Sequence, residues 1–175
     1  MSRTSTSFIT LLLAASFIIG CGGTPRPDGM PRLYPASITV IQEGTPLEGA
    51  MVRLVAVDAS LARWEPSGIT DASGVAAMRI DGRFDGAPLG NYKVLVSKRE
   101  QEPHPHPELA SLPPGDPNAQ RYIDAARNLK TYTYVEPQYD SVENTPLRVE
   151  ITASQRSYTV DAGKKIRNEE RPWWR

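Results

Sequence analysis

The stretch GNYKVLVSK, residues 90–98, shows most clearly how this chain folds. Tyr92, Val94 and Val96 fall on one face of an extended segment, and Lys93 falls on the other. Alternation with a period of two is typical of a β-strand, because successive side chains point to opposite faces of a sheet. We therefore expect a strand at residues 90–98.

Other short runs of the same kind surround this strand. They are rich in Val, Ile and Thr, and residues that favour turns separate them. The run AMVRLVAV at residues 50–57 is apolar on both faces, which predicts a strand in the middle of its sheet. The alternation of apolar and polar side chains in residues 145–152 predicts a strand with one face exposed to solvent. About seven short strands joined by tight turns favour an all-β fold, an antiparallel β-sandwich. The expected strands are residues 36–41, 50–57, 67–70, 74–80, 90–98, 145–152 and 155–162.

Between residues 100 and 140 the strand pattern stops. Six prolines fall within residues 101–117, and proline cannot donate a hydrogen bond to the ladder of a central strand. Asp116 can cap a helix that has Pro117 at its first position and continues to about Lys130. We expect a proline-rich insertion that is either mobile or a binding loop, followed by one short helix lying on the sandwich.

The amino terminus predicts export and lipid anchoring. Arg3 precedes a largely apolar stretch at residues 8–19, which is too short to span a bilayer and is typical of a signal peptide. The residues IIG at 18–20 come directly before Cys21, the only cysteine. This arrangement resembles the lipobox of bacterial lipoproteins, in which the cysteine becomes the lipidated first residue of the mature chain. The alternative is an ordinary signal peptide followed by a free thiol.

These features divide the chain into four parts. Residues 1–20 are a lipoprotein signal peptide. Residues 21–35 contain four prolines and three glycines, so we expect a flexible tether without a core of its own. Residues 36–162 form the β-sandwich with the insertion at about 100–140, and residues 163–175 form a charged and aromatic tail.

Several segments of the expected sandwich carry motifs in a fixed order. They are PASITVIQEGTPLEGAMVRLV at 35–55, Thr-Asp-x-x-Gly at 70–74, DGAPLGNYKVLVSK at 85–98 and TPLRVEI at 145–151. Following a lipobox, this order resembles the small secreted lipoproteins of planctomycete-type bacteria, whose domain is of the carboxypeptidase regulatory-like, transthyretin-like type. The resemblance implies a prealbumin-like β-sandwich with a non-catalytic surface role and no defined ligand.

The resemblance also implies particular roles and two departures. In that family the segment matching residues 70–74 is a hairpin turn, and the residue matching Tyr92 brings an aromatic ring into the core. Ile38 stands where glycine is frequent, and Ala76 stands where a large aromatic side chain usually fills the core. We expect the packing to differ in detail and the fold to be retained, because neighbouring residues can compensate a change of core volume.

The histidines are the first candidates for a metal site. His104 and His106 are the only two, and they lie in EPHPHPE beside Glu102 and Glu108. The alternating prolines hold this segment near an extended polyproline conformation, so that successive side chains point in different directions. Closed structural zinc sites need four converging ligands. We therefore expect an exposed loop with no bound metal.

The remaining chemistry-bearing residues favour no enzyme. Asp71, Asp81 and Asp85 lie near turns and not in a D-x-[DN]-x-[DN]-G calcium loop. A serine nucleophile would need a base, and the histidines are confined to the proline run. The chain has 20 basic and 20 acidic side chains, which gives no electrostatic footprint for nucleic acid. We expect no catalytic residues, no cofactor and no nucleic-acid partner.

The function expected from the sequence is that of a lipid-anchored cell-envelope protein. Its sandwich would be an interaction or structural module, facing away from the cytoplasm at the cell membrane or outer membrane, with an envelope protein or glycan as partner. The adjacent Trp173 and Trp174 could bind such a partner or a membrane interface, or belong to a disordered end. The alternative is a carbohydrate- or peptide-binding surface lipoprotein that uses the proline loop, the tryptophan pair, or Tyr132, Tyr134 and Tyr139.

Overall fold

The structure is a computed structural model that describes residues 25–113 and 115–170. The expected signal peptide, residues 1–20, lies outside this part of the chain, and so do three single residues to which the sequence assigns roles. They are Cys21, expected to be lipidated, and Trp173 and Trp174, named as possible interaction residues.

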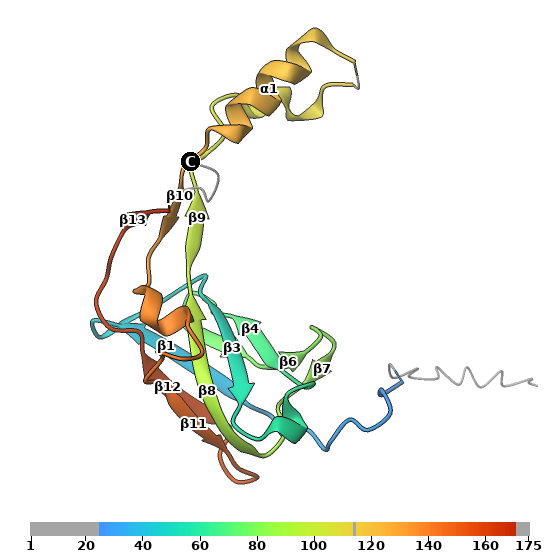
Figure 1. Cartoon of the computed structure of the whole chain (residues 1–175), viewed down its shortest axis with the longest axis vertical. Helices are drawn as coiled ribbons and strands as arrows, with labels where there is room; N and C mark the ends of the chain where they lie inside the picture. The colour runs from blue at the N-terminus through green and yellow to red at the C-terminus, as the bar shows by residue number, and fades with distance from the viewer. Residues whose placement is uncertain (1–24, 114, 171–175) are drawn as a thin grey trace, which may run out of the picture.

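Two β-sheets, packed against each other, form the body of the protein (Figure 1). The larger sheet contains, in spatial order, β11 (Arg148–Ile151), β8 (Gly90–Ser97), β3 (Met51–Ala56), β4 (Pro66–Ile69), β6 (Arg79–Ile80) and β7 (Phe84–Asp85). The smaller sheet is built around β1 (Ser37–Gln42), which pairs with β12 (Ser157–Asp161), β2 (Thr45–Pro46) and β5 (Val75–Ala77). The expected all-β sandwich is confirmed, and each of the seven expected segments contains a strand.

The pairing differs from the expectation in two places. The segment 74–80 divides at Met78 into β5 and β6, which belong to different sheets. The strand β12 runs parallel to β1, so the sandwich is not antiparallel throughout. The hydroxyl of Tyr158 accepts from the Thr152 N–H at 3.1 Å and donates to the Gln155 carbonyl at 2.9 Å, which closes the turn after β11. The chain crosses between sheets at this turn instead of forming a hairpin.

The core lies between the two sheets and follows the predicted alternation. Val52 and Leu54 of β3 pair with Val96 and Val94 of β8, and all four side chains are fully buried. Each such side chain contributes about 1.5–3 kcal/mol by its burial. Tyr92 is also fully buried, and its hydroxyl donates to the carbonyl of Pro88 at 3.0 Å. The aromatic ring that the family resemblance implies therefore lies in the core.

Ile38 and Ala76, where the sequence departs from the family pattern, are direct partners across the antiparallel pair of β1 and β5. Both side chains are fully buried. Opposite residues in such a pair have Cβ atoms about 4.5–5.5 Å apart and share the same face. A large and a small side chain therefore lie next to each other in the core.

The amino-terminal segment differs from the expected tether of residues 21–35. From Met30 onward it lies against the sandwich, and Tyr34 and Ala87 exchange backbone hydrogen bonds of 2.8 and 2.9 Å. A second hydrophobic cluster explains this contact, since its large side chains need cover from water. The cluster consists of Trp64, Ile80 and Phe84, with Met30 and Leu33 packed against it.

The predicted insertion forms an arm, defined here as residues 99–133, that projects from the sandwich (Figure 1). The base of the arm is a stalk of three short strands, β9 (Arg99–Gln101), β10 (Thr131–Thr133) and β13 (Asn168–Glu169), with β10 in the middle. The far end, called the tip and defined as residues 102–130, holds a 3-10 helix, η2 (Pro107–Ser111), and the helix α1 (Pro117–Arg127).

The expected helix is present but in another place. Its start is as predicted, because Pro117 is the first helical residue and the Asp116 carboxylate accepts from the Asn118 N–H at 2.8 Å. The expectation that it lies on the sandwich is wrong, since α1 packs against η2 at the far end of the arm. The physical reason is the stalk, which continues beyond β8 and carries the helix away from the sheets.

Candidate functional site

The arm and the amino-terminal segment lie at opposite ends of the sandwich (Figure 1). The amino-terminal segment contacts Ala87, just before β8 begins at Gly90. The arm begins at Arg99, just after β8 ends at Ser97. Eight residues of strand separate these points, which corresponds to about 26 Å. The molecule therefore has an entry end and an arm end.

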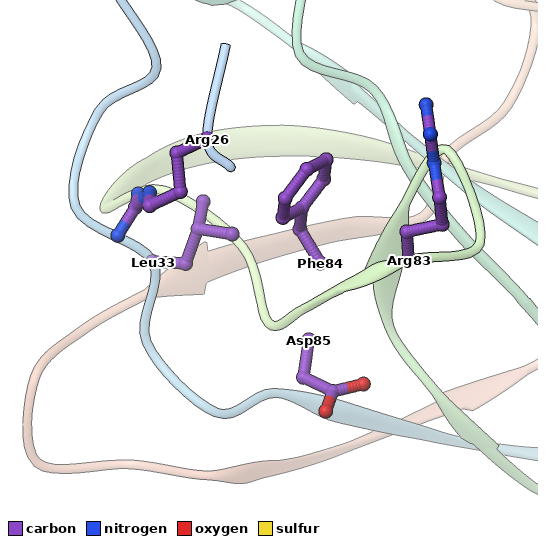
Figure 2. Close-up of a pocket in the computed structure, with 5 residues that line it drawn as sticks. All are labelled: Arg26, Leu33, Arg83, Phe84 and Asp85. Atoms are coloured by element: carbon purple, nitrogen blue, oxygen red, sulfur yellow. The ribbon is translucent and has the colours of Figure 1, made fainter. Parts of the chain in front are cut away.

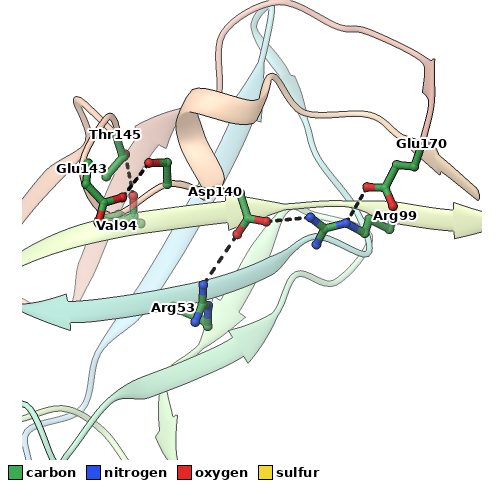
Figure 3. Close-up of polar contacts among 8 residues, drawn as sticks. Arg53, Val94, Arg99, Asp140, Glu143, Thr145 and Glu170 are labelled. Atoms are coloured by element: carbon green, nitrogen blue, oxygen red, sulfur yellow. Dashed lines mark hydrogen bonds and ion pairs between the residues drawn. The ribbon is translucent and has the colours of Figure 1, made fainter. Parts of the chain in front are cut away.

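Arg99 joins the arm to two other parts of the chain (Figure 3). Its Nε lies 2.7 Å from Oε1 of Glu170, and its Nη2 lies 2.9 Å from Oδ2 of Asp140. Asp140 ends the short helix η3 (Pro137–Asp140), and its Oδ1 lies 3.7 Å from Arg53 on β3. The hydrogen bonds to Glu170 and Asp140 raise the pKa of the Arg99 guanidinium above its ordinary value. This chain of charges fixes the base of the arm to the larger sheet.

The segment that carries Asp140 is itself held on β8. Thr145 is buried, and its hydroxyl donates to the Val94 carbonyl at 2.8 Å (Figure 3). The ammonium group of Lys93 donates to the Val142 carbonyl at 2.8 Å. Because these contacts position the segment on a core strand, Asp140 is a fixed anchor for Arg99.

A second group of contacts holds β13 on the stalk. The Arg167 guanidinium lies 4.1 Å from the ring centre of Tyr132, whose hydroxyl donates to Glu102 at 2.9 Å. The Lys130 ammonium lies 2.9 Å from the Glu169 carboxylate. The hydrogen bond to Glu102 raises the pKa of Tyr132, and the one to Glu169 raises the pKa of Lys130. The stalk is therefore closed by contacts between the insertion and the carboxyl-terminal segment.

The tyrosines considered for glycan binding are occupied by contacts within the chain. Tyr132 lies under Arg167, and Tyr134 lies under Lys98 with 5.5 Å between the ammonium and the ring centre. Tyr139 is buried, with 8% of its surface exposed. The three rings therefore do not form a free stacking platform.

The two histidines lie together at the tip, and the His104 ring has a structural role. The ring of His104 stacks on Tyr122 with 4.0 Å between centres, and its Nε2 lies 3.0 Å from the Tyr122 carbonyl. Its Nδ1 accepts from the backbone N–H of His106 at 3.0 Å. This network assigns His104 the neutral form with the proton on Nε2. Both ring nitrogens are thereby used to hold the proline run against α1.

The three aspartates near turns contribute to local structure. The Asp71 carboxylate accepts from the Ser73 hydroxyl at 2.6 Å and from the Val75 N–H at 3.0 Å, and these bonds lower its pKa. Asp81 lies in a turn with a positive φ of 52°, and Asp85 pairs with Arg79 at 2.7 Å. Among the residues that the structure describes, no group of three or more His, Cys, Asp or Glu side chains is placed to hold a metal ion.

A small surface pocket of about 280 Å³ lies where the amino-terminal segment passes β7 (Figure 2). It is lined by Arg26, Leu33, Arg83, Phe84 and Asp85. Arg26 and Arg83 lie on opposite sides of Phe84, with their guanidinium groups pointing apart. Arg26 donates to the Pro31 carbonyl at 2.6 Å. The polar side chains of the pocket are therefore either hydrogen-bonded within the protein or directed away from one another, so they do not point together at a position that a ligand could occupy.

The tip has no buried core among its described residues. Of the described residues between 102 and 130, none is buried. Ile123 of α1 is 43% exposed. The half-buried apolar residues of the tip are Leu109, Leu112, Ala119, Tyr122, Ala125, Ala126 and Leu129. We therefore take the tip, held out on the stalk, as the candidate interaction site.

Sequence reasoning missed the stalk and the residues that fix it. Arg99, Asp140 and Glu170 lie far apart in the chain, and nothing local to any of them indicates a shared contact. The sequence did contain one signal for β10, because TYTY at residues 131–134 combines β-branched and aromatic residues that favour strands.

Comparisons with known proteins give no match to the chain, whether among family models, curated proteins or solved structures. The resemblance to envelope lipoproteins therefore rests on the sequence motifs alone. Across residues 25–113 and 115–170, no helix is long and apolar enough to cross a membrane.

Proposed function

We propose that this protein is a lipid-anchored cell-envelope protein, held through Cys21, whose sandwich is a non-catalytic module that presents the arm to a partner. The single observation that carries this proposal is the position of the arm. It leaves the sandwich at the end opposite to the entry of the amino-terminal segment.

The short connection to the anchor supports this orientation. Met30, where contact with the sandwich begins, is nine residues after Cys21, a distance of at most about 32 Å along the chain. The entry end of the sandwich would therefore stay near the bilayer. β8 and the stalk would then place the tip as the described part farthest from the membrane, where it can contact another envelope component.

The environment of the polar side chains supports a role in binding and not in catalysis. His104 has both ring nitrogens in hydrogen bonds, and Asp71 and Asp85 serve a turn and an ion pair. A nucleophile needs a base within hydrogen-bond reach, and His106, the other described histidine, has its Nδ1 3.4 Å from the Glu108 carboxylate. The glycan-binding alternative would depend on the proline loop or on Trp173 and Trp174, because the tyrosines considered for it are engaged.

Lipid anchoring is tested by replacing the cysteine in the producing bacterium. We expect the wild-type protein to incorporate labelled palmitate and to sediment with membranes. The variant Cys21→Ser should do neither, whereas the control Gly23→Ala should behave as the wild type. Unchanged sedimentation of Cys21→Ser, with no label in the wild type, would contradict the proposal.

The role of the tip is tested by photo-crosslinking in intact cells. A photoreactive amino acid at Ser111, in η2, should give a discrete crosslinked product with an envelope component. The same group at Ser60, at the entry end, serves as the matched control. A product from Ser60 and none from Ser111 would show that the partner binds elsewhere.

A further inference from the structure

Three apolar side chains form a patch at the entry end of the sandwich. The patch, called the entry patch, consists of Val57, Leu61 and Leu89. Val57 directly follows β3 and is 62% exposed, and Leu89 directly precedes β8 and is 43% exposed. Leu61 is half-buried and is the last residue of the short helix η1 (Ala59–Leu61). Exposed apolar patches mark surfaces that contact a partner or a membrane.

The side chains of the entry patch are neighbours in space. The Val57 N–H donates to the Asn91 carbonyl at 2.9 Å, so the pairing of β3 with β8 continues to this point. Leu89 lies two residues before Asn91 and therefore on the same face as Val57. The Cδ1 of Leu61 lies 3.3 Å from the position that a Cβ on Gly90 would take. Leu61 therefore covers the start of β8, next to Leu89.

The entry patch lies beside the segment that leads to Cys21. The Trp64 N–H donates to the Leu61 carbonyl at 2.8 Å, and Trp64 belongs to the cluster on which Met30 and Leu33 pack. Figure 1 shows the turn between β3 and β4 next to the amino-terminal segment. Met30 is nine residues after Cys21, at most about 32 Å along the chain. A bilayer that holds Cys21 can therefore touch the entry patch.

Two exposed arginines at the entry end can bind phosphate. Arg63 lies 4.8 Å from the ring centre of Trp64, and Arg83 lies 5.8 Å from that of Phe84. The two rings belong to one cluster. Among residues 25–113 and 115–170, neither guanidinium group is ion-paired with a carboxylate, whereas Arg99 at the arm end has two such pairs. Phosphate oxygens accept hydrogen bonds from guanidinium groups in the same way as carboxylates do.

We propose that the entry patch, together with Arg63 and Arg83, is a contact surface for the phospholipid bilayer. Val57 and Leu89 would enter the boundary between headgroups and acyl chains, and the two guanidinium groups would bind headgroup phosphates. This inference rests on the proposed lipid anchor and goes beyond it, because a tether alone leaves the sandwich free to rotate. Contact at the entry end would keep the arm directed away from the membrane.

The other exposed apolar pair of the larger sheet lies at the arm end. Met51 and Ile69 are direct partners there and are 40% and 62% exposed. Met51 also pairs with Ser97, the last residue of β8, whereas the entry patch lies at the start of that strand. Because this pair has similar exposure and the same apolar character, it is the matched control for the entry patch.

The first experiment couples the chain from Cys21 onward, through its only thiol, to a maleimide lipid in vesicles of phosphatidylcholine and phosphatidylglycerol. This tether makes the result independent of whether cells acylate Cys21, which the palmitate experiment decides. A photoreactive amino acid at Ala59, in η1, should form an adduct with phospholipid that mass spectrometry detects. The same group at Thr45, which pairs with Gln42 at the arm end, should form none.

Substitutions identify the side chains that make the contact. Val57→Asp/Leu89→Asp should lower the yield of the Ala59 adduct several-fold, because a carboxylate resists transfer out of water. The control Met51→Asp/Ile69→Asp should leave the yield unchanged, and circular dichroism verifies that both variants fold. Equal adducts from Ala59 and Thr45, an unchanged yield in Val57→Asp/Leu89→Asp, or no adduct from Ala59 would overturn the proposal. The last result would leave the entry patch to a protein partner.

The second experiment needs no substitution. The N–H groups of Leu61 and Trp64 donate to the carbonyls of Asp58 and Leu61 at 3.0 and 2.8 Å. Their amide exchange should slow several-fold when the chain is coupled to the vesicles, compared with the same chain capped at its thiol with N-ethylmaleimide. Exchange at Glu102 and Tyr134 in the arm should not change. Unchanged exchange at Leu61 and Trp64 would show that the entry patch does not contact the bilayer.

Discussion

The role of Arg99 in fixing the arm predicts a local loss of stability in Arg99→Met. Methionine keeps much of the aliphatic length and removes both ion pairs. The Arg99 side chain is 51% exposed, and those of Glu170 and Asp140 are 36% and 24% exposed. Exposed pairs contribute about 0.2–1 kcal/mol each. We expect the upper part of this range, because both distances are below 3 Å and Asp140 is partly buried. The free energy of opening the stalk should fall by about 1–2 kcal/mol, a factor of roughly 5–30.

Amide hydrogen exchange measures this opening directly. The N–H groups of Glu102, Tyr134 and Glu170 close the stalk through backbone hydrogen bonds of 2.9, 2.9 and 2.8 Å. Their exchange should accelerate by the factor given above, while that of Leu47 and Met78 in the sandwich stays constant.

The matched control for this experiment is Arg63→Met. The Arg63 guanidinium lies 4.8 Å from the ring centre of Trp64, which is part of the cluster at the entry end. This variant should leave the stalk amides unchanged. The reasoning is refuted if Arg99→Met leaves their exchange within twofold of the wild type, or if it accelerates exchange equally across the sandwich.

Three further predictions concern the sandwich and the entry segment. Ala76→Phe should lower the free energy of unfolding, measured with denaturant, by about 1–3 kcal/mol through overpacking. Adding Ile38→Ala to this variant should restore part of the loss. If the effects of the two substitutions are simply additive, residues 38 and 76 are not in contact. Burial raises the pKa of Tyr92 to about 12. The contribution of this shift to stability should therefore be complete below pH 10 and disappear as the pH rises through 12. In Tyr92→Phe, this part of the loss of stability at alkaline pH, measured by circular dichroism, should be absent. Gly86→Ala should release the amino-terminal segment, because Gly86 has a φ of 103° and a Cβ would clash with the Tyr34 backbone; wild-type resistance of this segment to proteolysis would refute that.

The sequence predicted the elements whose signals are local. Period-two alternation located β3 and β8, and Asp116 with Pro117 located the start of α1. The crossing of β12 to the other sheet could not be predicted, because the alternation in residues 155–162 is the same for parallel and antiparallel pairing.

The candidate site was only partly predictable for the same reason. The proline run identified the insertion, but the stalk depends on contacts of Arg99 with residues 41 and 71 positions away. β9 and β10 have only three residues each, too few for a periodic pattern. The composition of residues 21–35 indicated a tether, whereas the contact of Met30 depends on the distant cluster around Trp64.

The proposal that the lipid anchor and the arm lie at opposite ends of the protein is tested most directly by fluorescence energy transfer to a labelled bilayer. The lipidated protein, reconstituted in vesicles with a fluorescent acceptor lipid, offers no free thiol at Cys21, so Ser60→Cys and Ser111→Cys each provide one labelling site. We expect strong transfer from position 60, at the entry end, and weak transfer from position 111, at the tip. Equal transfer from both positions, or stronger transfer from position 111, would contradict it.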